Sequence, residues 1–259
     1  MYFACFVGKN LFLDFGLFLI ETVTRQHFTL HQALLRDLGC ALPSGARVLD
    51  FGCGAGAMVE EYRRQGFAAY GCDPKIADET AHLRRLDTPA YRIPFADNNF
   101  DFVFSDQVME HVQDHALALA EIRRVLRPGG ISLHIFPSRW KPLESHVLVP
   151  LAGVCQSRVW LSLWARLGVR TAAQKGLAAR EVAARNHEYL TTRTRYLNKK
   201  ELRRVFGAHF DEVIFAEKQL LANTYGGARR IGPLAQKWPG LATLYGSFYS
   251  RVILARRNF

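Results

Sequence analysis

Short apolar runs alternate with segments of helical periodicity along much of this chain. An apolar run of strand length, such as residues 100–105, is typical of a parallel strand that is buried on both faces of a sheet. Elsewhere, apolar residues recur at helical spacing, as they do at Leu30, Leu34 and Leu38. The expected strands are residues 47–50, 67–72, 90–92, 100–105, 131–136, 210–218 and 245–255. The pattern predicts an α/β chain.

Local signals mark where several helices begin and end. Residues 1–26 fit a short hairpin as well as a helix, and both interpretations stay open. A helix is expected over residues 29–39, with Thr29 capping its start. Asn198 and Glu201 have the spacing of a capping box, so another helix is expected to begin directly after Asn198. Further helices are expected at residues 57–62, 75–85 and 108–126.

Three glycines at alternate positions, Gly52, Gly54 and Gly56, follow the first expected strand. A glycine has no Cβ, so its backbone can take a positive φ and a ligand can lie almost against it. The helix that follows points its unpaired N–H groups at the same place. This loop therefore predicts a site for a nucleoside.

The glycine spacing alone does not identify the nucleoside. Gly52-x-Gly54-x-x-Ala57 also satisfies a relaxed form of the dinucleotide fingerprint, and Asp73 lies about where that fingerprint has its ribose-binding acid. A carboxylate can accept two hydrogen bonds side by side, which suits the two adjacent ribose hydroxyls. The alternative is that Asp73 and Pro74 simply start a turn.

Two later motifs distinguish a dinucleotide site from a site for another nucleoside. They are residues 93–105, which begin Ile-Pro-Phe-Ala-Asp, and residues 126–130, which read Leu-Arg-Pro-Gly-Gly. With Asp50 and the glycine loop, they resemble the class I S-adenosylmethionine-dependent methyltransferases in order and interval. The resemblance is good over residues 47–136 and loose over 197–218. It implies S-adenosylmethionine as the cofactor and a doubly wound, Rossmann-like sheet of seven mostly parallel strands, the last one antiparallel.

The resemblance also implies a division of the chain and a set of cofactor contacts. Residues 1–46 form an N-terminal cap segment, 47–136 the cofactor-binding half, 137–196 a helical insertion that serves as a substrate lid, and 197–259 the rest of the domain. Pro89 stands where family members commonly carry the acid that holds adenine, and Asp87 lies two residues earlier. The cofactor contacts expected are Asp50, Gly52, Cys53, Gly54, Gly56, Asp73, Pro74, Ala90, Tyr91, Ser105, Asp106 and Gln107.

Two histidines are the candidates for catalysis. Methyl transfer to a hydroxyl needs a base, and a neutral histidine titrates in the right range. His111 follows the strand at 100–105, and His146 stands near the start of the expected lid. Related O-methyltransferases read Glu-x-x-Glu-His here and bind a divalent metal. In this chain Gln107 replaces the first acid, and a neutral amide is a poorer ligand for a hard cation, so no metal is expected.

Composition and charge indicate the cellular compartment and the kind of partner. The chain has 259 residues, 49% of them apolar, and five scattered cysteines, as in a reduced intracellular protein. No basic region precedes the apolar N-terminus, so neither a signal peptide nor a membrane span is expected. Residues 1–138 hold 13 Lys+Arg against 16 Asp+Glu, and residues 139–259 hold 21 against 7. The positive half indicates an anionic partner or simply a solvated surface.

The acceptor is expected to be a small, lipid-linked or sugar-linked molecule, methylated at oxygen, that carries negative charge or lies beside it. We expect a cytoplasmic protein, with peripheral contact at the inner membrane surface as an extension. Two other functions stay open. One is methylation of RNA through the basic half, although no nucleic-acid-binding module is recognisable there. The other is a catalytically silent cofactor-binding or scaffold protein. The sequence does not indicate an oligomeric state.

Overall fold

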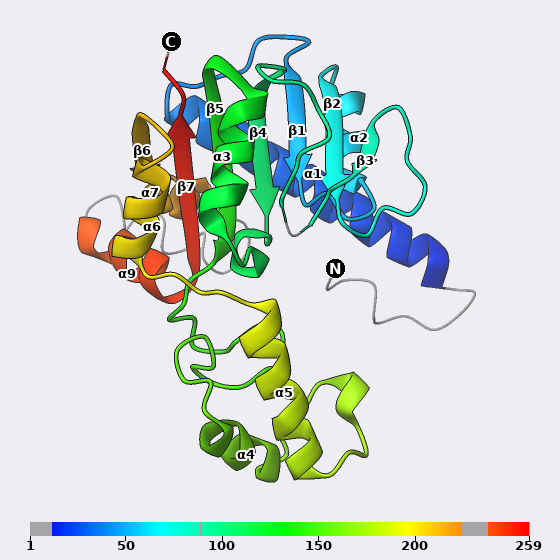
Figure 1. Ribbon diagram of the computed structural model, residues 1–259, viewed down its shortest axis with the longest axis vertical. Coiled ribbons are helices and arrows are strands. Elements are labelled where there is room, and N and C mark those ends of the chain that lie inside the picture. The colour runs from blue at the N-terminus through cyan, green and yellow to red at the C-terminus, as the bar shows by residue number, and fades with distance from the viewer. Residues whose placement is uncertain (1–11, 89, 224–237, 259) are drawn as a thin grey trace.

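The computed structural model describes residues 12–88, 90–223 and 238–258, and within them the chain folds around one seven-stranded sheet (Figure 1). The strand order is β3-β2-β1-β4-β5-β7-β6. Neighbouring strands from β3 to β5 are parallel, and β7 is antiparallel to both β5 and β6. The strands are β1 (Arg47–Phe51), β2 (Ala68–Asp73), β3 (Leu83–Arg85), β4 (Phe100–Asp106), β5 (Leu126–Pro137), β6 (Glu212–Phe215) and β7 (Ser250–Arg256).

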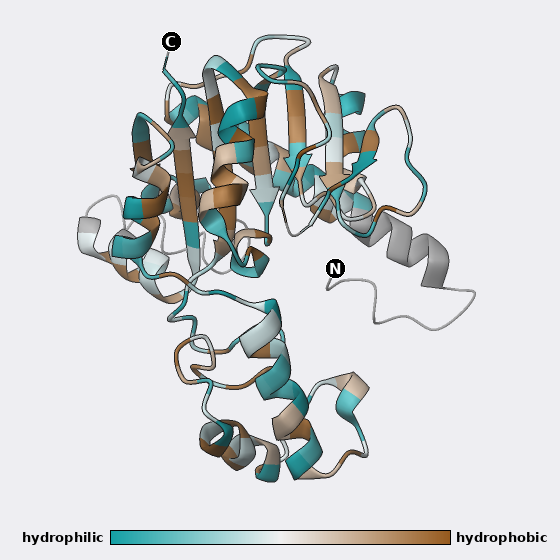
Figure 2. Cartoon of the chain, viewed as in Figure 1, coloured by the Kyte–Doolittle hydropathy of each residue, from teal (hydrophilic) through white to brown (hydrophobic). Residues whose placement is uncertain are grey.

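Helices cover both faces of this sheet. On one face, α1 (Phe12–Asp37), α2 (Ala57–Arg64) and α7 (Glu217–Asn223) share an apolar core with the sheet. On the other face, α3 (His115–Val125) and α6 (Lys199–Gly207) share a second core. Because side chains alternate along a strand, Val48 enters the first core and Leu49 the second. Figure 2 shows the apolar strands running through the middle of the domain.

The architecture confirms the predicted doubly wound, mostly parallel sheet with an antiparallel last strand. The capping box predicted before α6 is also present, because Asn198 Oδ1 accepts from the Glu201 N–H while Glu201 accepts from the Asn198 N–H. The prediction that Thr29 starts a helix is wrong. Thr29 lies inside α1, where its hydroxyl donates to the Arg25 carbonyl at 2.9 Å. Residues 1–11 of the open N-terminal prediction lie outside the described residues.

Two other predicted elements differ in the structure. The segment after β2, expected to be a helix, contains the edge strand β3, and around Ala90 the chain forms one isolated bridge between Asp87 and Arg92 rather than a strand. At the other end of the chain, residues 245–248 belong to helix α9 (Pro239–Phe248), so the last strand starts later than expected. The sequence pattern did not predict β3, because an edge strand with exposed arginines lacks the apolar run of a buried strand.

The insertion between β5 and α6 is a small unit with its own core. It contains α4 (Arg158–Arg166), a short 3-10 turn (Ala172–Gln174) and α5 (Ala179–Arg193). Its buried residues include Val149, Leu161 and Leu190. Figure 1 shows it beyond the edge of the sheet where the parallel strands end, with α4 at the far tip. Among the described residues no helix combines the length and the apolar character needed to cross a membrane.

Candidate functional site

The glycine loop between β1 and α2 is shaped by three positive φ angles. Gly52, Gly54 and Gly56 have φ values of 88°, 54° and 86°. A Cβ on Gly52 would lie 2.4 Å from the Val108 side chain, so only glycine fits there. A Cβ on Gly54 would meet nothing within 4 Å, so this part of the loop is open to a ligand. The backbone can therefore approach a bound nucleoside closely.

Asp73, at the end of β2, is tied to this loop. Its Oδ2 accepts the Gly54 N–H at 3.0 Å, and its Oδ1 accepts the Lys75 N–H at 2.8 Å. The second of these contacts is the turn that the sequence offered as an alternative role. The first joins the carboxylate to the open part of the loop. Each carboxylate oxygen can accept more than one hydrogen bond, so both roles are compatible.

Three carboxylates lie at the ends of neighbouring parallel strands: Asp50 on β1, Asp73 on β2 and Asp106 on β4. Burial raises the pKa of Asp50 well above its usual value, and the charges of Asp106 and Asp73 raise it further. A cation placed among these groups would relieve their mutual repulsion, whereas an anionic pyrophosphate would add to it. The edge of the sheet is therefore suited to a positively charged ligand.

Asp106 is held by two histidines of α1 that the sequence analysis did not single out. His27 Nδ1 lies 3.2 Å from Asp106 Oδ2, and His31 Nε2 lies 3.2 Å from Asp106 Oδ1. Burial opposes ionisation of Asp106, but His31 and His27 more than compensate and hold its pKa below its usual value. The available signal was their spacing, because residues four apart share one face of a helix. These contacts fasten α1 beside the candidate cofactor site.

Three other expected cofactor contacts, Ser105, Gln107 and Tyr91, differ in burial and in their hydrogen bonds. Ser105 is fully buried, and its hydroxyl lies 2.8 Å from His134 Nδ1 between β4 and β5. Gln107 is exposed and has a φ of 56°. The hydroxyl of Tyr91 accepts the Gln113 N–H at 2.7 Å.

The other expected cofactor contacts are Pro74, Ala90 and Cys53. Pro74 and Ala90 are exposed, and Pro89 lies outside the described residues. The Cys53 side chain fills the space where a Cβ on Gly71 would stand, so it supports the loop from below.

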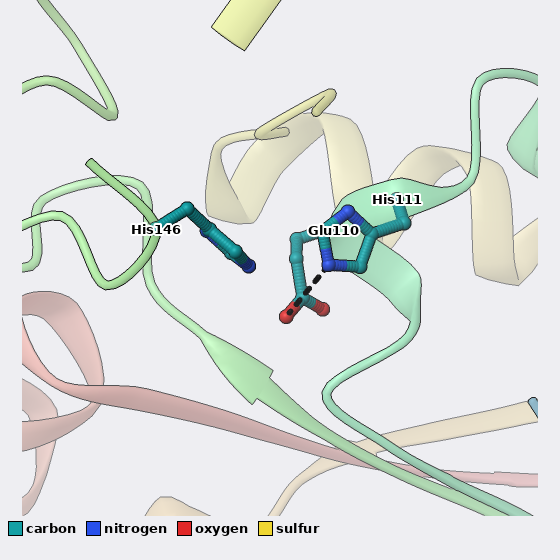
Figure 3. Close-up of side chains that lie close together, drawn as sticks. All are labelled: Glu110, His111 and His146. Atoms are coloured by element: carbon teal, nitrogen blue, oxygen red, sulfur yellow. Dashed lines mark ion pairs between the residues drawn. The ribbon is translucent and has the colours of Figure 1, made fainter. Parts of the chain in front are cut away.

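The two predicted catalytic histidines lie together with a buried acid. Figure 3 shows Glu110, His111 and His146 converging on one small space. The rings of His111 and His146 are 4.8 Å apart between centroids, and His111 Nε2 lies 4.0 Å from Glu110 Oε1. One potential ligand atom from each residue lies within 4.8 Å of the others. The sequence predicted the two histidines and did not predict that they would meet.

The hydrogen bonds fix which nitrogen of each ring carries the proton. His111 Nδ1 lies 2.8 Å from the Arg193 carbonyl, and His146 Nδ1 lies 2.5 Å from Glu144 Oε1. A carbonyl and a carboxylate can only accept, so Nδ1 donates in both rings. In the neutral histidines, Nε2 is therefore the basic atom. Burial lowers the pKa of His111, which favours its neutral form.

Glu110 is the buried acid of this cluster. Only 2% of the residue is exposed, and neither carboxylate oxygen has a hydrogen-bond partner in the described part of the chain. Burial raises the pKa of Glu110 to about 8. Two arrangements would satisfy such a group, namely a proton that it carries itself or a cation held beside it. Gln107 offers no carboxylate to a metal, but His146 joins Glu110 and His111 as a third potential donor.

The insertion is fastened to the sheet next to these histidines. The Arg195 N–H donates to the Glu110 carbonyl at 2.7 Å, and the Tyr196 hydroxyl donates to Glu144 Oε1 at 2.6 Å. Burial alone would raise the pKa of Glu144, but His146 and Tyr196 hold it below its usual value. Glu144 is therefore an ionised acid that joins both ends of the insertion and orients one candidate base.

The central part of the chain is similar to known methyltransferases. A family described as a methyltransferase domain matches residues 49–133. The ubiquinone biosynthesis O-methyltransferase of Rhizobium rhizogenes is 35% identical over 139 residues, which cover 43% of this chain and 56% of the relative. The protein of the same description from Nitrobacter winogradskyi is 36% identical over 106 residues, covering 37% and 40%. The chain thus spans about half the length of the curated relatives it matches.

The likeness to solved structures concerns the fold. A chain of the complex containing the Haloferax volcanii Trm112 methyltransferase activator matches with a TM-score of 0.50 and 20% sequence identity. The match covers 91% of each chain. It therefore extends over the insertion and the C-terminal part as well as over the matched domain.

Proposed function

We propose that this chain, which carries a class I S-adenosylmethionine-dependent methyltransferase domain, methylates an oxygen atom of a small, lipid-linked or sugar-linked acceptor. The observation that carries the proposal is the pair of basic nitrogens, His111 Nε2 and His146 Nε2. They face one space at the sheet edge that also bears the glycine loop. The description of the relatives as O-methyltransferases supports an oxygen acceptor.

The charges at the strand ends support S-adenosylmethionine as the cofactor rather than a dinucleotide. Its sulfonium is positive, and it has no pyrophosphate to be repelled by Asp50, Asp73 and Asp106. The open space at Gly54 lets a nucleoside lie on the loop. Asp73 lies beside this space, because its carboxylate accepts the Gly54 N–H. Asp73 would accept from the ribose hydroxyls, as expected from its place at the strand end.

The reaction requires the acceptor oxygen to lose its proton while it gains the methyl group. The bound cofactor supplies that methyl group. His146 Nε2 takes the proton from the acceptor hydroxyl, and ionised Glu144 stabilises the imidazolium that forms. His111 is the alternative base, because its Nε2 is also the basic nitrogen. The insertion, as the proposed substrate lid, keeps water away from the reacting groups.

A second candidate function is metal-assisted O-methylation. The unpartnered carboxylate of Glu110, together with His111 and His146, offers three donors within 4.8 Å of one another. A divalent cation held there would polarise the acceptor oxygen and lower the pKa of its hydroxyl. The two functions differ in an observable way, since only the second is abolished by a chelator.

The acceptor is proposed to be apolar in part and to carry negative charge or lie beside it. The insertion brings an apolar core together with arginines, and Arg193 is exposed at the end of α5, where its carbonyl contacts His111. An arginine can donate two hydrogen bonds at once to a carboxylate or phosphate. We place the protein in the cytoplasm, where a lipid-linked acceptor would be reached at the inner membrane surface.

An acceptor screen with tritium-labelled S-adenosylmethionine tests this function. The panel contains phenols with and without isoprenoid tails, sugar-linked lipids and total RNA, each with EDTA or added Mg²⁺. Transfer to a lipid-linked or sugar-linked hydroxyl, lost in His146→Ala, is the expected result. Loss of transfer in EDTA would select the metal-assisted function. Transfer to RNA alone would replace the proposed acceptor, and no transfer at all would indicate a silent cofactor-binding protein.

A further inference from the structure

Helix α4, at the tip of the insertion, exposes apolar side chains on the face that turns away from its core. Val159 and Leu163 of α4, and Leu167 directly after its last residue, are 81%, 45% and 66% exposed. At helical spacing these three positions lie within an arc of about 80°. Leu161 and Ala165 lie on the opposite side and are fully buried against the insertion's own core. The helix therefore has two apolar faces, and only one of them is covered within the described residues.

Positive charge surrounds this exposed stripe of Val159, Leu163 and Leu167. Residues 145–180 contain no Asp or Glu. Their cationic residues are Arg158, Arg166, Arg170, Lys175 and Arg180, and all of these except the half-buried Arg170 are exposed. At helical spacing Arg166 falls next to Val159 on the flank of the stripe. A surface that is apolar in the middle and cationic around it complements anionic lipid headgroups above an apolar interior.

The size of the stripe favours a lipid surface over a protein partner. Three aliphatic side chains on one short helix and its C-cap cover far less than the roughly 1,200 Å² that a stable protein interface buries. An interfacial helix needs less area, because burial of a few apolar side chains adds to attraction between basic residues and anionic lipids. The position fits as well, since α4 lies at the end of the insertion farthest from the sheet (Figure 1).

We propose that α4 is an interfacial helix that seats the insertion on an anionic phospholipid surface through Val159, Leu163 and Leu167. Arginines beside the stripe, Arg166 above all, contact the headgroups. The purpose of the contact, delivery of a lipid-linked acceptor to His111 and His146, rests on the proposed function. The contact itself does not, because it needs neither cofactor nor turnover.

Vesicle flotation tests the contact with the full chain and no acceptor. The probes are vesicles of phosphatidylcholine alone and vesicles in which about a quarter of the lipid is phosphatidylglycerol. We expect binding to the anionic vesicles and weaker binding at high salt. The triple variant Val159→Ser, Leu163→Ser, Leu167→Ser should bind about tenfold more weakly or worse, and Arg166→Ala about fivefold more weakly.

Matched controls come from the sheet domain. Leu117 on α3 is 47% exposed, and Lys200 on α6 is exposed, so Leu117→Ser and Lys200→Ala should bind vesicles as the wild type does. Thermal unfolding of every variant shows whether it is folded, and Leu167→Ser alone replaces the triple variant if the triple variant does not fold.

Unchanged binding by the stripe variants, or equal loss in Leu117→Ser, would overturn the proposal. Self-association that disappears in the triple variant would also overturn it, since a second copy would then cover the stripe. If the vesicles bind but the acceptor screen fails, only the proposed function is lost.

Discussion

Glu144 Oε1 lies 2.5 Å from His146 Nδ1 and 2.6 Å from the hydroxyl of Tyr196, which stands 52 residues further along the chain. The same carboxylate also accepts the backbone N–H groups of His146 and Val147 through Oε2. One acid near the start of the insertion therefore holds its end, through Tyr196, and orients the histidine that faces the sheet. His146 is placed for chemistry only when the whole insertion is folded.

Replacing His146 tests its role as a base. His146→Ala should lower kcat by about 10²- to 10⁴-fold, the usual contribution of general acid–base catalysis. Glu144→Gln should lower kcat less and should move the acid limb of the kcat–pH profile to lower pH, because a neutral amide stabilises the imidazolium less. Both are measured by initial rates with the acceptor found in the screen.

The control for these variants is His187→Ala. His187 also lies in the insertion, but its Nδ1 contacts the Gln156 carbonyl at 2.9 Å and lies outside the cluster. It should therefore keep the wild-type rate. If Glu144→Gln leaves the pH profile unchanged while His146→Ala is inactive, Glu144 only stabilises the insertion.

Asp73→Asn should weaken binding of S-adenosylmethionine without unfolding the protein. The amide keeps the size of the side chain but removes a charged acceptor from the ribose hydroxyls, which costs about 1.5–3 kcal/mol. Titration calorimetry gives the affinity, and thermal unfolding checks the fold. A folded variant with wild-type affinity would reduce Asp73 to the turn contact with Lys75.

The attachment of α1 should depend on pH through His27. Its hydrogen bond to Asp106 raises the pKa of His27. A histidine whose pKa is raised by folding stabilises the folded state. This stabilisation is fully present below the unfolded-state pKa of about 6.5 and is lost as the pH rises through the folded-state pKa. The Tm of the wild type should therefore fall relative to that of His27→Gln as pH rises above about 6.5. Parallel curves for the two proteins would show that this contact does not stabilise the fold.

Arg193 tests whether the acceptor carries negative charge. Arg193→Ala should raise KM for the acceptor and leave cofactor affinity unchanged, and added salt should have a similar effect because the side chain is exposed. Arg195 is a poorer probe, since its guanidinium donates to the Gln113 carbonyl and holds the segment in place. Identical kinetics in Arg193→Ala and the wild type would remove the reason to expect an anionic acceptor.

The sequence predicted those parts of the site whose geometry is local. Positive φ angles need glycine, so Gly52, Gly54 and Gly56 marked the loop directly, and the spacing of Asn198 and Glu201 marked the start of α6. The strand-end position of Asp73 followed from the expected strand at residues 67–72 directly before it. In each case the residues that decide the structure lie within one short segment.

The rest depends on contacts between distant segments. His27 and Asp106 are separated by 79 positions, and Tyr196 and Glu144 by 52, so nothing in the local pattern pairs them. The apolar residues of α4 show periodicity for two faces, and periodicity alone does not say which face packs against α5. The contact between Ser105 and His134 is hidden for the same reason, because His134 comes from the neighbouring strand.

Titration calorimetry with S-adenosylmethionine and NAD⁺ is the measurement that decides which nucleoside the glycine loop binds. Asp50, Asp73 and Asp106 lie at the ends of neighbouring strands, where they favour a positively charged sulfonium and disfavour an anionic pyrophosphate. We expect S-adenosylmethionine to bind, Asp50→Asn to bind it more weakly, and NAD⁺ not to bind. Binding of NAD⁺ without binding of S-adenosylmethionine would contradict this expectation.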